Sequence, residues 1–100
     1  MKIHELKLRE TFADAVLDGD KTFEIRRNDR GFQTGDCIRF KTIGFDSNIG
    51  EYPAMHEIDD HLFRIKYILN GWGLRDEYVA LAIEDLGIVT NDEPNGGEIE

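Results

Sequence analysis

Apolar and polar positions alternate with a period of two along several short stretches of this chain. Successive side chains of a β-strand point to opposite faces, so the pattern predicts strands with one buried face. Five to six strands are expected, at residues 2–8, 21–26, 36–43, 62–69 and 78–84. The clearest is "LFRIKYIL", in which one face holds Phe63, Ile65, Tyr67 and Leu69, and the other holds Arg64 and Lys66.

A short helix of about two turns is predicted directly after the first strand, in "TFADAVLDG". Thr11 followed by Asp14 resembles a capping box, in which the two side chains satisfy backbone donors at the start of a helix. Gly19 supplies the left-handed residue that commonly ends a helix. The apolar face of this helix is expected to consist of Phe12, Ala15 and Val16.

The remaining segments set the fold class. Residues 44–53 have the composition of a loop or a long hairpin connection, and residues 56–61 suit a loop or one helical turn equally well. With one or two short helices, a helix-covered parallel sheet is not expected, and a small, mostly antiparallel β-barrel of five to six strands is predicted. Residues 1–88 are expected to form one domain, and residues 89–100 an acidic, disordered tail.

Charge narrows the choice of ligands. The chain of 100 residues has a formal net charge of −9. Residues 1–41 carry nine Lys and Arg against eight Asp and Glu, whereas residues 42–100 carry three against thirteen. Because binding to phosphate draws its affinity mainly from cations, the whole molecule is a poor generic nucleic-acid binder. Contact with nucleic acid is expected only on a local cationic face of the first half.

Several classes of protein are not indicated. The lone Cys37 excludes an intrachain disulfide and suits a reducing compartment, most simply as a small apolar residue in a strand. No apolar run approaches the ~20 residues of a membrane helix, so a cytoplasmic protein without membrane contact is expected. His4, His56 and His61 lack the spacing of common zinc sites, and no glycine loop for phosphate occurs, so neither metal nor cofactor is predicted.

The stretch "GDKTFEIRRNDRGF" concentrates cations in the second predicted strand and the turn after it. Period-two geometry places Thr22, Glu24 and Arg26 on one face, and we expect the other face, with Phe23 and Ile25, to be core. Glu24 and Arg26 lie about 7 Å apart at Cα, within reach of a charge-assisted hydrogen bond. The simplest interpretation is an amphipathic strand with a surface ion pair that contributes little to stability.

The residues from Gly19 to Arg26 match the G-x-K-x-x-E-x-R pattern of ASCH domains, relatives of the PUA-like RNA-binding folds. The segments "KIHELKLRETFADAVLDGDKTFEIRRNDRGFQTGDCIRF" and "YILNGWGLRDEYVALAI" resemble a small ASCH-like family of bacterial and phage proteins without a settled function (DUF3850-like). The resemblance covers nearly residues 1–84. It implies a β-barrel with the short helix near one mouth, and a cleft that accepts RNA or a nucleotide-like ligand.

The resemblance also implies roles for residues of this cleft. Lys21 would supply a point charge to phosphate, and Arg26 a planar fork for bidentate contact. Glu24 would orient these cations or accept hydrogen bonds from base or ribose donors. Arg27 and Arg30, on the adjoining turn, would hold backbone phosphates.

Further residues complete the expected ligand-binding set. Thr22 supplies the nearest hydroxyl, and Arg39 and Lys41 extend the cationic patch on the next strand. Trp72 lies between two glycines, in a loop expected near the same mouth. Two interpretations of Trp72 stay open: it stacks on a base, as in single-strand binders, or it closes the barrel core as a lid.

Two other classes of function remain as alternatives. Some ASCH relatives hydrolyse modified pyrimidine nucleosides or RNA, and here Lys21 would act as base, Glu24 as proton shuttle and Thr22 as the nearest hydroxyl. The amidohydrolase branch carries Thr where this chain has Glu24, which counts against that mechanism. The second alternative is a protein-interaction module that uses the acidic half of the chain as its interface.

Overall fold

The computed structural model describes residues 1–89 and 98–99 of the chain. They are mostly β-structure with one short α-helix and one 3-10 turn, so the predicted mostly-β class is confirmed. The described strands form a mixed sheet that is not closed into the expected barrel. In chain order the elements are β1 (Lys2–Arg9), α1 (Glu10–Leu17), β2 (Phe23–Arg27), β3 (Cys37–Asp46), β4 (Gly50–Pro53), the 3-10 turn η1 (Glu57–Asp60), β5 (His61–Asn70), β6 (Tyr78–Ile88) and β7 (Glu98–Ile99).

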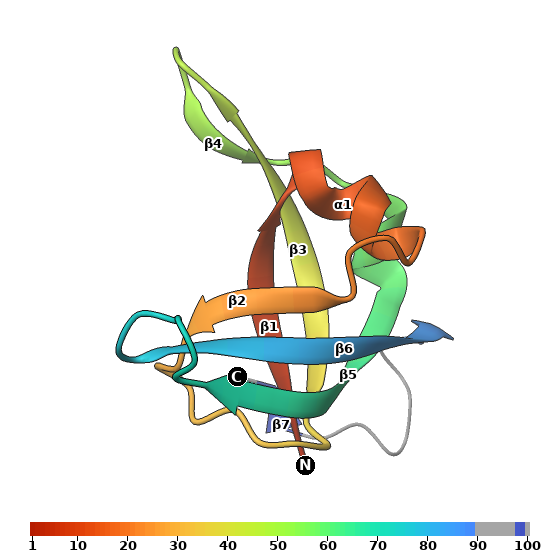
Figure 1. Cartoon of the computed structure of the whole chain (residues 1–100). Coiled ribbons are helices and arrows are strands. Elements are labelled where there is room, and N and C mark those ends of the chain that lie inside the picture. Colours follow the sequence, from red (N-terminus) through yellow and green to blue (C-terminus); the bar gives the residue numbers. More distant parts are fainter. Residues whose placement is uncertain (90–97, 100) are drawn as a thin grey trace.

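The described strands form one curled sheet in the order β2-β6-β5-β3-β1-β7, and β4 forms a hairpin with β3. β1 pairs in parallel with β3, and the long connection through α1 and β2 provides the crossover that a parallel pair requires. β7 is parallel to β1. The other pairs are antiparallel. In Figure 1, β2, β6 and β5 cross over β1 and β3. The described residues show no ladder between β2 and β1, and we call this line the seam.

The core lies between the two halves of this curled sheet. It consists mainly of inward-facing apolar side chains from the strands and of Ala13 and Val16 of α1, and the loop before β3 and the turn η1 each add one more. Phe40 and Phe63 meet edge to face with ring centroids 5.3 Å apart, a favoured geometry for aromatic pairs. Cys37 is buried beside this core, and burial raises the pKa of its thiol, as suits the structural role predicted for it.

Helix α1 begins two residues earlier than the capping box predicts. Its N-cap is Arg9, which makes no side-chain capping bond, so Thr11 lies inside the first turn and the predicted capping box is wrong. The predicted end is confirmed, since Gly19 follows the helix with a φ of 82°. Such a positive φ is readily adopted by glycine because it has no Cβ. Phe12, expected on the buried face, is 46% exposed.

A β-bulge in β5 changes which of its side chains face the core. The register of β5 against β6 shifts between Ile65 and Tyr67. Ile68 therefore packs against the core, whereas Tyr67 is 61% exposed and Leu69 is 37% exposed. One inserted residue inverts the alternation that follows it, so the predicted burial of Tyr67 and Leu69 is wrong.

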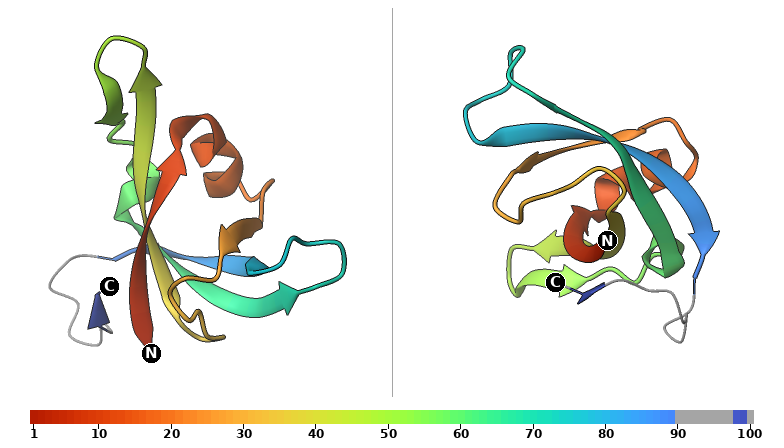
Figure 2. Two further views of the ribbon diagram at one scale, coloured as in Figure 1. Left: turned by 90° about the vertical axis from the view of Figure 1, so that its left-hand side faces the viewer. Right: turned by 90° about the horizontal axis from the view of Figure 1, so that it is seen from below.

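The segments left open by the sequence have defined structures. β3 continues to Asp46 and pairs with β4, so much of residues 44–53 forms a hairpin that projects from the body of the molecule (Figure 2). Residues 57–60 form the 3-10 turn η1. The predicted disordered tail, residues 89–100, falls mostly outside the described residues. No helix among the described residues is long and apolar enough to cross a membrane.

A buried polar pair ties the start of β1 to the turn before β3. Nε2 of His4 lies 2.8 Å from Oδ2 of Asp36, and the Asp36 carboxylate also accepts backbone N–H groups of Lys2 and Gln33. Burial raises the pKa of Asp36, but these hydrogen bonds outweigh it, so the pKa of Asp36 lies below its ordinary value. Among the described residues, no three His, Cys, Asp or Glu side chains gather as metal ligands would.

Candidate binding cleft

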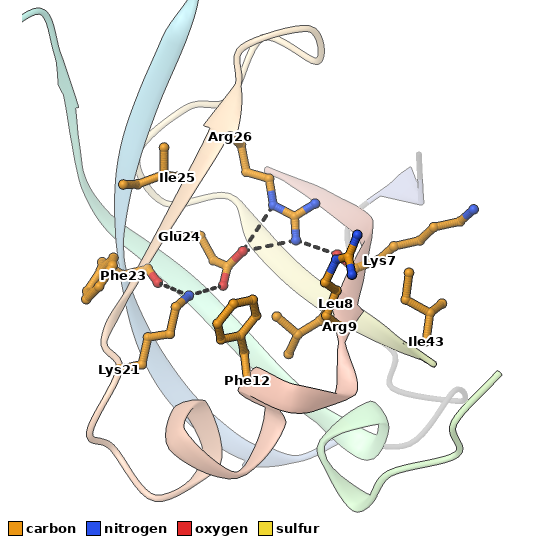
Figure 3. A pocket seen from close by; sticks show the side chains of 10 residues that line it. All are labelled: Lys7, Leu8, Arg9, Phe12, Lys21, Phe23, Glu24, Ile25, Arg26 and Ile43. Carbon is orange, nitrogen blue, oxygen red and sulfur yellow. Dashed lines mark hydrogen bonds and ion pairs between the residues drawn. The ribbon is translucent and has the colours of Figure 1, made fainter. Parts of the chain in front are cut away.

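A cleft of about 440 Å³ opens at the seam, between β1, the start of α1 and the free edge of β2 (Figure 3). Its polar lining consists of one carboxylate and four cations: Glu24, Lys7, Arg9, Lys21 and Arg26. Its apolar lining includes the rings of Phe12 and Phe23. We call it the triad cleft, after the three residues Lys21, Glu24 and Arg26 that meet in it.

The register of β2 turns two members of this triad inward. Glu24 and Arg26 stand opposite Leu81 and Val79 of β6, which are both buried. Residues directly opposite on neighbouring strands share a face, so Glu24 points into the fold and is only 4% exposed.

The prediction that Phe23 and Ile25 belong to the core is therefore wrong. These side chains are 47% and 52% exposed, and they point away from Glu24 in Figure 3. Period two tells which side chains share a face, but it does not tell which face is buried. The inward face of β2 can hold the charged Glu24 because two cations compensate its charge.

Glu24 lies between its two cationic partners and binds each with a different oxygen. Oε1 accepts a hydrogen bond of 2.8 Å from Nζ of Lys21, and Oε2 accepts one of 3.0 Å from Nε of Arg26. The Lys21 and Arg26 side chains are 21% and 24% exposed, so both reach solvent through the cleft. The three residues therefore differ from the surface ion pair of the simplest interpretation, because the carboxylate that both cations share is buried.

Lys21 is held in place by its backbone and by two aromatic rings. The end of α1 is tight, with the backbone N–H of Lys21 donating to the carbonyl of Ala15. From there Nζ of Lys21 donates to the carbonyl of Phe23 at 2.9 Å and lies 4.9 Å from the centroid of the Phe23 ring and 5.4 Å from that of Phe12. Such cation–π contacts stabilise an ammonium group.

Arginine side chains bridge the seam where the backbone ladder is missing. Nη2 of Arg26 donates to the carbonyl of Lys7, and Nη1 of Arg30 donates to the carbonyl of Glu5 at 2.8 Å. Glu5 and Lys7 are two residues apart in β1, so both carbonyls point to the same edge of that strand. Arg26 thus belongs to the triad and to the closure of the sheet at once.

Six residues of the predicted ligand-binding set are outside the lining of the triad cleft: Thr22, Arg27, Arg30, Arg39, Lys41 and Trp72. Arg39 donates instead to the backbone carbonyls of η1 and of the residue after β6. Arg27 is on the opposite face of β2 and pairs with Glu77 at 2.9 Å, and Thr22 is exposed outside the cleft lining. Trp72 is 90% exposed in the loop between β5 and β6, so it is not a lid over the core. Because Thr22 is not part of the cleft lining, it gives the hydrolase alternative no support, and that alternative stays a prediction.

The cleft also contains residues that the sequence interpretation did not assign to it. Lys7 and Arg9 reach it from β1, and Phe12 from α1. Alternation in the first strand does place Lys7 on its polar face. The missing information is the position of β1 next to the seam, because strand order is set by long-range pairing that alternation does not encode.

Fold and site together define a small mixed-sheet domain with a cation-lined cleft built around one buried carboxylate. The chain belongs to the family described as a domain of unknown function, DUF3850, which matches residues 3–83. It is also similar to the uncharacterized 12.9 kDa protein in the GpA 3' region of Escherichia phage P2, with 46% identity over 37 residues. That match covers 37% of this chain and 34% of the phage protein, so the chain spans about a third of its relative's length.

Proposed function

We propose that the triad cleft binds a nucleotide-like ligand, as a free nucleotide or as a segment of RNA. The observation that carries this proposal is the convergence of Lys21, Glu24 and Arg26 on one cleft. Separately, these residues would be unremarkable surface charges. Together they form a prearranged anion site, since Glu24 holds both cations before a ligand arrives and reduces the cost of ordering them.

The groups around the triad match the parts of a nucleotide. Two of the three N–H donors of Lys21 bind Glu24 and the carbonyl of Phe23. Arg26 binds Glu24 and Lys7 through Nε and Nη2, so its Nη1 takes no part in these bonds. These remaining donors suit phosphate oxygens, for which the Arg fork is particularly apt. The rings of Phe12 and Phe23 offer apolar surface to a base.

The resemblance to ASCH domains supports the same proposal. The G-x-K-x-x-E-x-R pattern provides the three residues of the triad, and the spacing of the pattern has a structural reason in this chain. Lys21 precedes β2, whereas Glu24 and Arg26 share its inward face, so the three side chains meet from two directions. We infer that this domain is ASCH-like and PUA-related in its use of the cleft.

Titration calorimetry at low salt tests the proposal with 5'-nucleotides and short RNAs. We expect binding that Lys21→Ala weakens about tenfold, as the loss of a charge-assisted contact does. Arg26→Lys is the sharper variant at the second cation, because it keeps the charge and removes the planar fork. We expect Arg26→Lys to weaken binding as well.

Lys66→Ala is the matched control, because Lys66 is exposed on β5 and lines none of the cleft. It should bind as the unaltered protein does. The proposal is wrong if no nucleotide or RNA binds at low salt, or if Lys21→Ala and Lys66→Ala bind equally well while circular dichroism shows both to be folded.

A further inference from the structure

A second hollow continues the triad cleft along the seam. It has a volume of about 390 Å³ and is lined by Glu5, Leu6, Lys7, Arg26, Arg30 and Lys41. Lys7 and Arg26 line both hollows, so the two hollows are neighbours on the surface. Each is of the size of a site for one small ligand. A ligand that fills both is therefore longer than one nucleotide unit.

The second hollow is as cationic as the triad cleft. Four cations line it against the single carboxylate of Glu5. The two hollows together contain six of the twelve Lys and Arg residues of the chain, against two carboxylates. In a protein of net charge −9, this concentration defines one local positive surface suited to a polyanion.

Two lysines of the second hollow are placed in an arrangement that an anion would stabilise. Lys7 of β1 stands directly beside Lys41 of β3 in the parallel register. Like charges in register on neighbouring strands are about 5 Å apart and repel. Their partners Glu51 and Glu5 lie at 2.6 and 3.5 Å, but Lys7 and Lys41 are 65% and 67% exposed. Ion pairs this exposed are weak and exchange readily for a phosphate.

We propose that the second hollow is a phosphate subsite and that the ligand of the two hollows is a single-stranded polynucleotide. Its phosphodiester chain runs along the seam, with one nucleotide in the triad cleft and the next phosphate between Lys7 and Lys41. The proposal rests on the proposed function of the triad cleft. A cationic groove that follows the backbone, with aromatic rings beside it, is how single strands are commonly bound.

Calorimetry with two probes tests this proposal: uridine 5'-monophosphate, and the uridylate trimer with a 5'-phosphate. We expect the trimer to bind about tenfold more tightly than the monophosphate. Lys41→Ala should remove most of that gain and leave the monophosphate unaffected, because Lys41 lines only the second of these two hollows. Lys21→Ala should weaken both probes, and Lys66→Ala neither.

The possible results separate this proposal from the proposed function. If both probes bind with equal affinity, or if Lys41→Ala leaves the trimer unaffected, the second subsite is wrong and the triad site stands. If neither probe binds, both proposals fall. A trimer of glutamate that binds as tightly as the uridylate trimer, with the same loss in Lys41→Ala, would overturn the polynucleotide in favour of an acidic peptide.

Discussion

At the scale of single residues, Glu24 is the group on which the candidate site depends. It is a carboxylate in the interior of a small protein, and its two oxygens each hold one cation. The spacing of Lys21, Glu24 and Arg26 made the contact between them predictable. The burial of Glu24 was not predictable, because the alternation in β2 separates its side chains into two faces without showing which face is buried.

We expect Glu24→Gln to lower the free energy of unfolding by about 1–3 kcal/mol. The amide has the shape of the carboxylate but leaves Lys21 and Arg26 without a compensating charge. Chemical denaturation of both proteins at neutral pH measures the difference.

Glu51→Gln is the control for this substitution, because Glu51 pairs with the exposed Nζ of Lys7. Its cost should stay within about 0.5 kcal/mol. Equal costs for the two substitutions would mean that the triad is an ordinary surface ion pair.

Asp36 makes the stability of the fold depend on pH in the acidic range. Its pKa lies below the ordinary value of 3.8 because hydrogen bonds from His4 and two backbone N–H groups outweigh the effect of burial. A carboxyl whose pKa is lower in the folded than in the unfolded state stabilises the fold above its ordinary pKa. This stabilisation is lost as the pH falls through the folded pKa.

We therefore expect Asp36→Asn to be less stable than the unaltered protein at neutral pH, by about 1–3 kcal/mol. The gap should narrow as the pH falls from 3.8 through the lower pKa of the folded Asp36 carboxyl, because the carboxyl then becomes neutral, as the amide of the variant already is. Denaturation curves from pH 6 to pH 2 measure it. A gap that stays constant with pH would show that ionisation of Asp36 contributes nothing.

At the scale of elements, the positions of the strands were predictable from the sequence. Which face of each strand is buried was predictable only in part. β1 and β3 bury the faces that alternation indicates. β5 buries the expected face only as far as its bulge. The bulge was not predictable, because the run from Leu62 to Leu69 contains no glycine or proline that would indicate an extra residue. The burial of Ile68 in place of Tyr67 is a property of the pairing with β6.

This difference in β5 predicts unequal costs for two neighbouring substitutions. Ile68→Ala should destabilise the protein by about 1–3 kcal/mol, since Ile68 packs against the core but is only partly buried. Tyr67→Ala should cost clearly less, because most of its side chain is in water. Thermal and chemical unfolding of the two variants compare them directly, and a larger cost for Tyr67→Ala would contradict the bulged register.

At the scale of the whole molecule, the mostly-β class was predictable from five short periodic segments and one short helix. The strand order was not, since it is decided by long-range contacts. The parallel pairing of β1 with β3 is the clearest case. It brings Lys7 beside Lys41, thirty-four positions later in the chain, and so creates the cationic surface that the uneven charge of the sequence only suggested.

Because that surface belongs to an acidic protein, salt should act on binding and on stability in opposite directions. Binding of a single strand should weaken with salt, with a log–log slope of about −0.7 for each phosphate contacted. The free energy of unfolding should rise modestly, because salt screens the mutual repulsion of a chain with net charge −9. Parallel salt titrations of both quantities test this, and binding that is insensitive to salt would exclude phosphate contacts.

The seam gives this small domain a junction whose strength depends on what is bound. Most neighbouring strands are joined by backbone hydrogen bonds, which a ligand leaves alone. Here guanidinium groups join β1 to β2 and to the loop that follows β2, and the one from β2, Arg26, is also a ligand-binding candidate. Ligand binding in the cleft and local opening between β1 and β2 are thereby coupled through the side chain of Arg26. A ligand that draws Arg26 away from β1 loosens the junction between β1 and β2, and one that presses Arg26 toward β1 tightens it.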